Sequence, residues 1–315
     1  MRRALVVGID DYPTAPLAGC VNDAIAVADR LAKHDDGSPN FDCRLLTAPS
    51  SSITRSELRE AASELFRTDA DIALFYFSGH GTENDLGGYL VTPDAATYDE
   101  GVAMGDVLAL ANKSPAREVV IVLDCCSSGA FGRLPSVSND GVFLREGMAV
   151  LTATRSNQDA IESGGAGLFT ALLVGALDGG AADVVGEVTV AGMYAYVDQA
   201  FGAWDQRPLF MSHVTHLAPI RHCAPAVALE VLRQLPAWFT TADAEMPLDP
   251  SFEPEAEPHH EENESVFSML QQCRAAKLIE PVGEDHMYFA AMHSTACRLT
   301  PLGRYYWQLA NTGRI

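Results

Sequence analysis

The chain has 315 residues, 48% of them hydrophobic, so it is long enough to bury a substantial core in one large domain or two. A formal net charge of −21 disfavours nucleic acid and anionic membranes as partners and suits a basic substrate or partner, although such acidity is commonly just a solvated surface. Seven scattered cysteines without a secretory signal favour reduced thiols in the cytoplasm, and no apolar run reaches the roughly 18 residues of a membrane span.

Short apolar runs alternate with helical patterns over the first two thirds of the chain. We expect strands at residues 4–9, 43–47, 72–80, 117–123, 148–152 and 209–214, and helices at 22–31, 54–65, 107–112, 169–177 and 193–201. Residues 82–88 are polar with paired glycines and are expected to form a loop. Strands that alternate with helices predict an α/β fold with a mostly parallel sheet and helices on both faces.

The composition changes after Arg221. Residues 245–265 are acidic and proline-rich, which is typical of a flexible insertion or linker. We expect helices at 227–235, 266–276 and 300–309 and hairpin strands at 278–279 and 287–289, which together resemble a small α+β winged-helix-like module over 222–315. That range holds six Lys or Arg against thirteen Asp or Glu, so we expect it to bind or regulate proteins rather than read DNA.

Two predicted strands end in residues that can carry chemistry. The strand over 117–123 is followed by Asp-Cys-Cys-Ser-Ser-Gly, in which Cys126 is the second thiol, and the strand that begins at Ile72 ends in Ser-Gly-His-Gly around His80. Ligands bind at the carboxyl ends of parallel strands, and an imidazole makes a thiolate accessible, so we predict that His80 and Cys126 form a catalytic pair. Backbone N–H groups of Gly81 and Cys126 would form the oxyanion hole. The simpler alternatives are a buried structural cysteine and a histidine without a catalytic role.

These motifs resemble the caspase-like cysteine peptidases of clan CD (peptidase family C14), and most closely the metacaspase and orthocaspase branch. Further matching stretches bring the resemblance to about residues 1–217, namely residues 8–12, 17–24, 151–158 and 167–170. It implies a caspase-like, mostly parallel six-stranded sheet flanked by helices in a peptidase domain over 1–221, with His80 and Cys126 as the dyad and Cys125 as a neighbour without a catalytic role. Ser127 stands where metacaspases usually carry a His beside the nucleophile. The His that metacaspases carry at this position is not the general base. We therefore expect the departure to affect the assignment to a branch of the family and not the activity.

The same resemblance implies an acidic S1 pocket that selects Arg or Lys. Asp23 and Asp124 stand at the matching positions, and we expect Asp94 to join them. Carboxylates grip a guanidinium through paired, charge-assisted hydrogen bonds, so we expect cleavage after Arg, with Lys as the second choice. True caspases cleave after Asp and need an Arg in this pocket, for which Arg155 is the one candidate. The alternatives are a helix N-terminal carboxylate for Asp23 and a turn residue for Asp94.

Regulation leaves a weaker trace in the sequence. Arg133 and Arg145 follow the nucleophile in a long Gly- and Ser-rich segment. The two arginines are either sites of self-cleavage or ordinary solvated residues, and the sequence favours neither interpretation. Some metacaspases need calcium, but no EF-hand spacing occurs, so we expect no metal and no cofactor.

The resemblance therefore implies a cysteine endopeptidase acting on protein substrates with a basic P1 residue. We expect a zymogen-like enzyme, switched on by an activating protein partner or an upstream protease in a bacterial stress, cell-death or antiphage system. The alternatives are a catalytically silent caspase-like scaffold that acts through its C-terminal module and a peptide ligase on the same fold.

Overall fold

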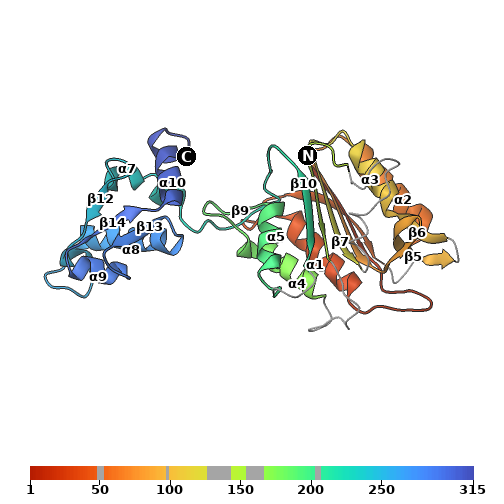
Figure 1. The fold of residues 1–315 in the computed structure, drawn as a ribbon, viewed down its shortest axis with the longest axis horizontal. Helices are drawn as coiled ribbons and strands as arrows, with labels where there is room; N and C mark the ends of the chain where they lie inside the picture. The colour runs from red at the N-terminus through yellow and green to blue at the C-terminus, as the bar shows by residue number, and fades with distance from the viewer. Residues whose placement is uncertain (48–52, 97–98, 126–142, 154–166, 203–206) are drawn as a thin grey trace. The chain divides into compact units, whose positions relative to one another are not determined.

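The computed structural model describes the chain except for residues 48–52, 97–98, 126–142, 154–166 and 203–206, which are grey in Figure 1. Contacts divide the chain into two compact units, the first formed by residues 1–182 and 187–224 and the second by 183–186 and 225–315. The division at 224/225 lies three residues beyond the expected domain end at 221, and the short segment 183–186 belongs with the second unit.

A six-stranded sheet forms the centre of the first unit. Its order is β10-β8-β7-β3-β1-β2. The strands are β1 (Arg2–Gly8), β2 (Phe41–Thr47), β3 (Ile72–Gly79), β7 (Glu118–Cys125), β8 (Met148–Thr152) and β10 (Leu209–His213). All neighbours pair in parallel except β10, which runs antiparallel to β8. The predicted mostly parallel α/β sheet is therefore confirmed, and the unbroken burial of β3 is typical of a strand covered on both faces.

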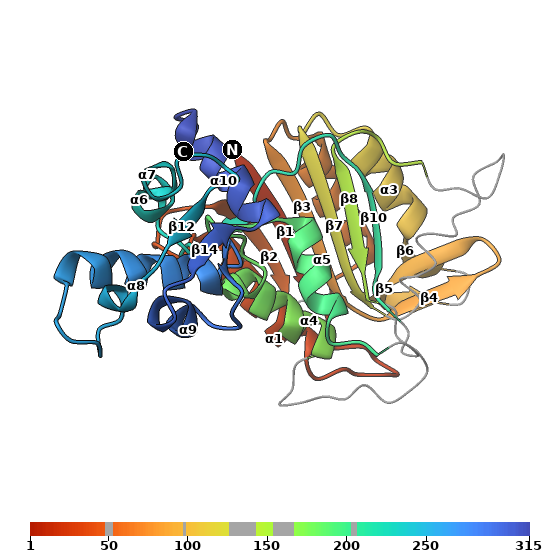
Figure 2. The same cartoon turned by 60° about the vertical axis from the view of Figure 1, so that its left-hand side comes forward.

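Helices cover both faces of this sheet (Figures 1 and 2). Helices α2 (Arg55–Arg67) and α3 (Met104–Asn112) pack on one face, and α1 (Cys20–Ala32), α4 (Leu168–Gly175) and α5 (Val190–Asp198) pack on the other. Alternate side chains of β3 enter the two cores, so that Phe75 and Phe77 lie on the α2 side and Leu74 and Tyr76 on the α1 side. The π-helical turn η2 (Ala176–Gly180) continues α4.

A separate antiparallel sheet of β4 (Gly81–Asn84), β5 (Gly87–Ala96) and β6 (Asp99–Ala103) follows the central strand β3. The prediction of a loop at 82–88 is therefore wrong, because these residues form a β-hairpin. The Asn84 side chain accepts a hydrogen bond from the backbone N–H of Leu86, and Gly87 closes the turn at a φ of 126°. Paired glycines mark the hairpin turn here and not an unstructured loop.

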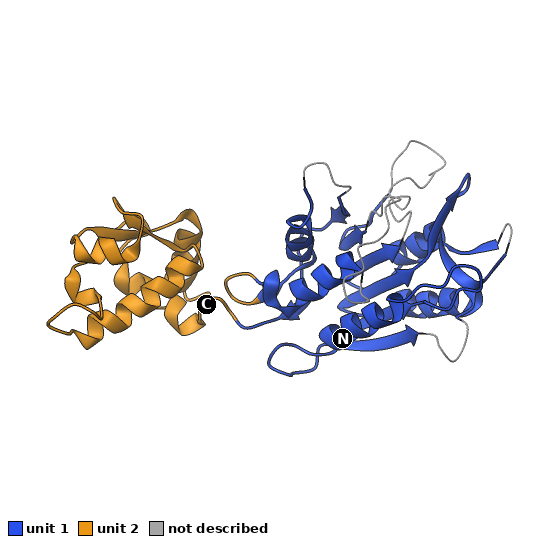
Figure 3. Ribbon diagram, turned by 90° about the horizontal axis from the view of Figure 1, so that it is seen from below, with its two compact units in different colours: residues 1–182, 187–224 blue, residues 183–186, 225–315 orange. Residues whose placement is uncertain are grey.

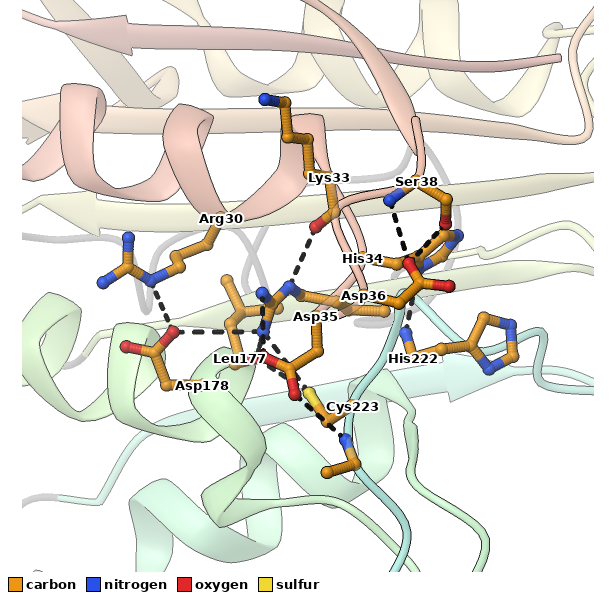
Figure 4. A network of polar contacts seen from close by, with 12 residues as sticks. Arg30, Lys33, His34, Asp35, Asp36, Ser38, Leu177, Asp178, His222 and Cys223 are labelled. Carbon is orange, nitrogen blue, oxygen red and sulfur yellow. Dashed lines mark hydrogen bonds and ion pairs between the residues drawn. The ribbon is translucent and has the colours of Figure 1, made fainter.

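Arg221 fixes the end of the first unit. It lies in β11 (Arg221–His222), which pairs with β9 (Glu187–Val188), and only 6% of its surface is exposed. Its guanidinium donates to the carbonyls of Lys33 at 3.0 Å and Leu177 at 2.6 Å (Figure 4). Beside it, the backbone N–H of His222 donates to Nδ1 of His34 at 3.0 Å. These contacts attach β11 to the ends of α1 and α4–η2.

The second unit has its own core and a three-stranded antiparallel sheet (Figure 3). The sheet order is β12-β14-β13, formed by β12 (Glu245–Pro247), β13 (Ile279–Val282) and β14 (Ala296–Leu299). The helices are α6 (Leu229–Leu232), α7 (Leu235–Trp238), η3 (Pro250–Phe252), α8 (Glu261–Ala275), α9 (Met287–Met292) and α10 (Pro301–Asn311). The unit is therefore α+β in composition.

Two expectations for this unit are wrong. The proline-rich residues 245–265 are not a flexible insertion, because they form β12 and η3 and bury Leu248 and Phe252. Residues 287–289 open helix α9 and not a strand, since Met287, Ala290 and Ala291 are buried at helical spacing. The hairpin partner of β13 is instead β14, which α9 separates from it. Among the described residues, no helix is both long and apolar enough to cross a membrane.

Candidate active site

Strands β3 and β7 end side by side in the sheet. They pair in parallel with Gly79 opposite Cys125. The residue that follows β3 is His80, and the residue that follows β7 is Cys126. Cys126 lies outside the described residues, as do Ser127, Arg133 and Arg155. The pairing of β3 with β7 therefore places His80 beside the end of β7, which Cys126 follows in the sequence. The catalytic pair of His80 and Cys126 remains a prediction.

Contacts from the segment after β1 hold the half-buried His80. Its Nε2 lies 2.7 Å from the carbonyl oxygen of Ala15, and its backbone N–H donates to the hydroxyl of Tyr12 at 2.9 Å. A carbonyl can only accept, so Nε2 carries the proton and Nδ1 of the neutral ring keeps its lone pair. The arrangement therefore leaves Nδ1 as the basic atom.

Tyr12 links three parts of this site. Its ring lies 4.5 Å from that of His80, centroid to centroid, and its hydroxyl donates to the carbonyl of Val91 at 3.2 Å. Burial raises the pKa of Tyr12 above its ordinary value, which keeps the phenol protonated as a donor. A Cβ at Gly79 would lie 2.5 Å from the Tyr12 hydroxyl oxygen, so this close approach requires glycine. Neither Tyr12 nor Ala15 has a role in the sequence-based site.

Gly81, the predicted oxyanion donor, is the first residue of β4. It is half-buried and pairs with Leu90 of β5, directly after His80. Its predicted partner Cys126 lies outside the described residues, so the oxyanion hole stays a prediction.

Two buried carboxylates lie on the α1 side of the same sheet edge. Asp124 has none of its surface exposed, and Asp23, in the first turn of α1, has 2% exposed. Asp124 lies on the same face of β7 as Val120 and Val122, which belong to the core under α1. Cys125 points the other way into the opposite core and is fully buried.

The start of α4 contacts both carboxylates. Oδ2 of Asp23 accepts from the backbone N–H of Gly167 at 3.3 Å, and Oδ2 of Asp124 accepts from the Thr170 hydroxyl at 2.7 Å. The hydroxyl of Tyr76 lies 2.6 Å from that of Thr170. Burial, and then the negative charges of Asp124 and Asp23, hold the pKa of Tyr76 well above its ordinary value. Both carboxylates therefore act on one buried ring.

The position of Asp23 follows from how α1 begins. The carboxylate of Asp10 accepts from the backbone N–H groups of Cys20 at 2.8 Å and Val21 at 3.3 Å. A Cβ at Gly8 would lie only 2.2 Å from the Cys20 carbonyl oxygen, so glycine lets α1 approach β1 closely. The helix N-terminus also favours the negative charge of Asp23, so the structural and the functional interpretations of this residue are compatible.

The structure does not bring Asp94 to these two carboxylates. Asp94 is exposed, and its oxygens accept from the backbone N–H of Arg55 at 3.0 and 3.2 Å. Arg55 begins α2, which packs on the opposite face from α1. Asp94 therefore serves the N-terminus of α2, a tertiary contact that its position after Pro93 does not reveal.

Arg145 is half-buried and its side chain is hydrogen-bonded to the fold. Its guanidinium donates to the carbonyls of Ala116 at 2.5 Å and Glu146 at 2.8 Å, and its backbone N–H donates to the Asn112 side chain. Cleavage after Arg145 would require these contacts to open. In the part of the chain that the structure describes, no group of three or more His, Cys, Asp or Glu side chains could hold a metal ion.

Comparisons with known proteins place this site in context. The model of the caspase domain family, Peptidase C14, matches residues 1–219, whereas no curated protein matches the chain. A crystal structure of protein GSU0716 from Geobacter sulfurreducens is 17% identical, covering 71% of this chain and 100% of that chain with a TM-score of 0.52. The structure of pro-sf-caspase-1 is 13% identical, covering 69% of this chain and 94% of that chain with a TM-score of 0.48. At these identities the structural likeness concerns the fold alone.

Proposed function

The chain belongs to the caspase domain family, and from that premise we propose that it is a cysteine endopeptidase that cleaves proteins after arginine, with lysine as the second choice. One observation supports this specificity most strongly. Asp23 and Asp124 are both buried on one face of the sheet, at the strand ends where His80 also lies. Two carboxylates in so small a region create a negative potential that favours a cationic P1 side chain.

In the proposed reaction Cys126 is the nucleophile and His80 the general base. The thiol transfers its proton to Nδ1 of His80, and the thiolate attacks the scissile carbonyl carbon. The negative oxygen would be stabilised by the backbone N–H groups of Gly81 and Cys126. Nδ1–H then protonates the leaving amine, and water hydrolyses the thioester to release the acid and restore the thiol. The Ala15 carbonyl at Nε2 stabilises the imidazolium between these steps.

Arginine fits the proposed S1 site better than lysine. A guanidinium offers five N–H donors in a plane, which matches two carboxylates that approach from different elements. Asp23 comes from α1 and Asp124 from β7, and each is held by a different donor at the start of α4. A lysine ammonium supplies the charge but not the planar fork.

The proposal is tested with fluorogenic peptides that carry Arg, Lys, Asp or Asn at P1. We expect turnover of the Arg peptide, weaker turnover of the Lys peptide, and no activity in Cys126→Ala. Cys125→Ala is the matched control and should stay active, because Cys125 is buried in the opposite core. Preference for Asp would contradict the acidic S1 site. Absence of turnover, even after addition of an activating protease, would favour the silent scaffold.

A further inference from the structure

A chain of three buried polar groups crosses from the central sheet to α4. Tyr76 comes from β3, Asp124 from β7 and Thr170 from α4, and their exposed fractions are 0%, 0% and 1%. The hydroxyl of Thr170 lies between the other two, 2.6 Å from the Tyr76 hydroxyl and 2.7 Å from Oδ2 of Asp124. A polar group buried this deeply is costly unless it is hydrogen-bonded, so the hydrogen bonds along this chain stabilise its three members.

The direction of the hydrogen bonds follows from the proton count. Asp124 as a carboxylate only accepts, so Thr170 uses its single proton to donate to Oδ2. The Tyr76 hydroxyl must then donate to the Thr170 oxygen. The chain therefore runs Tyr76 to Thr170 to Asp124. Removal of either hydroxyl weakens the hold on the carboxylate.

Thr170 is well suited to fix a direction. Its β-branched side chain limits χ1 to few rotamers, and the hydrogen bonds to Asp124 and from Tyr76 hold the hydroxyl in place. The residue three positions earlier, Gly167, holds Asp23 through its backbone N–H. The first turn of α4 thus contacts both carboxylates of the proposed S1 site, one through the main chain and one through a side chain.

We propose that Thr170, supported by Tyr76, is a positioning residue that orients the Asp124 carboxylate for an arginine at P1. This inference rests on the proposed function. Bidentate pairing with a guanidinium needs the carboxylate in a defined plane, whereas an ammonium is a point charge and tolerates rotation of the carboxylate. The hydroxyl of Thr170 therefore contributes more to cleavage after Arg than to cleavage after Lys.

The test compares wild type, Thr170→Val, Thr170→Ser and Tyr76→Phe on matched peptides with Arg or Lys at P1. Valine keeps the shape of threonine without the hydroxyl. We expect Thr170→Val to lower kcat/KM about tenfold for the Arg peptide and only about twofold for the Lys peptide, mainly through KM. Thr170→Ser should restore the Arg-to-Lys ratio, and Tyr76→Phe should lower it by a smaller factor.

Each outcome has a distinct meaning. An equal loss for both peptides in Thr170→Val, or a ratio that serine does not restore, would reduce Thr170 to a packing residue and overturn the inference alone. An unchanged ratio in both Thr170→Val and Tyr76→Phe would do the same. Wild type that cleaves after neither Arg nor Lys would instead overturn the proposed function, and the inference with it.

Discussion

Replacement of Tyr12 by Phe tests the support beneath the proposed general base. The substitution keeps the ring beside His80 and removes one buried hydroxyl, which accepts from the His80 backbone N–H at 2.9 Å and donates to the Val91 carbonyl at 3.2 Å. Leaving a buried partner unsatisfied costs about 1–3 kcal/mol. Since Val91 is half-buried, we expect the free energy of unfolding to fall by about 2 kcal/mol.

The same change should affect catalysis separately from stability. The backbone N–H of His80 loses its partner, so the ring is less firmly aligned on the Ala15 carbonyl. We expect kcat to fall about tenfold with KM nearly unchanged, because the defect lies in proton transfer and not in P1 binding. Activity is measured below the unfolding transition, and stability is measured by urea denaturation.

Tyr194→Phe is the matched control. Tyr194 is partly buried and its ring stacks on Phe210 with centroids 5.2 Å apart, but its hydroxyl makes no hydrogen bond to any residue that the structure describes. We expect both its stability and its kcat to stay near wild type. If Tyr12→Phe loses no more stability and no more kcat than Tyr194→Phe, the Tyr12 hydroxyl does not hold His80 in place as proposed.

Three further changes test other parts of the structure. Arg221→Met should lower the free energy of unfolding, measured by urea denaturation, by about 3 kcal/mol, because it leaves the Lys33 and Leu177 carbonyls without their buried donor. A loss below about 1 kcal/mol would contradict the stabilising role of these two hydrogen bonds. Burial lowers the pKa of His34 below its ordinary 6.5, so at pH values below 6.5 the unfolded chain binds more protons at His34 than the folded chain, and the free energy of unfolding should fall as the pH is lowered. His34→Gln should flatten this dependence of stability on pH between pH 7.5 and 5.5, and an unchanged dependence would argue against the role of His34. Asp94→Ala should cost about 0.5–1 kcal/mol of stability through the N-terminus of α2 and leave the Arg-to-Lys ratio unchanged, whereas a changed ratio would return Asp94 to the S1 site.

The central sheet could be predicted because its strands have a strong local signal. Strands β3 and β7 are apolar runs of strand length that end in polar residues, as expected for parallel strands covered on both faces. Parallel pairing then brings the ends of such strands together without further information. The side on which Cys125 and Asp124 point follows from simple alternation along β7.

The supporting contacts could not be predicted because they join residues far apart in sequence. Tyr12 and His80 are 68 positions apart, and Thr170 and Asp124 are 46 apart. Nothing local at Asp94 indicates that its carboxylate meets the N-terminus of α2. Composition was misleading in the second unit, where prolines and glutamates suggest flexibility although Phe252 is buried.

The most direct test of the proposed nucleophile and S1 site is covalent labelling with a peptide ketone that carries a leaving group and has Arg at P1, followed by mass spectrometry of the digested protein. We expect that Cys126 is labelled, that the same probe with Asp at P1 does not react, and that His80→Ala loses the label. Labelling of Cys125, or reaction with the Asp probe in preference to the Arg probe, would contradict the assigned nucleophile or the acidic S1 site, respectively.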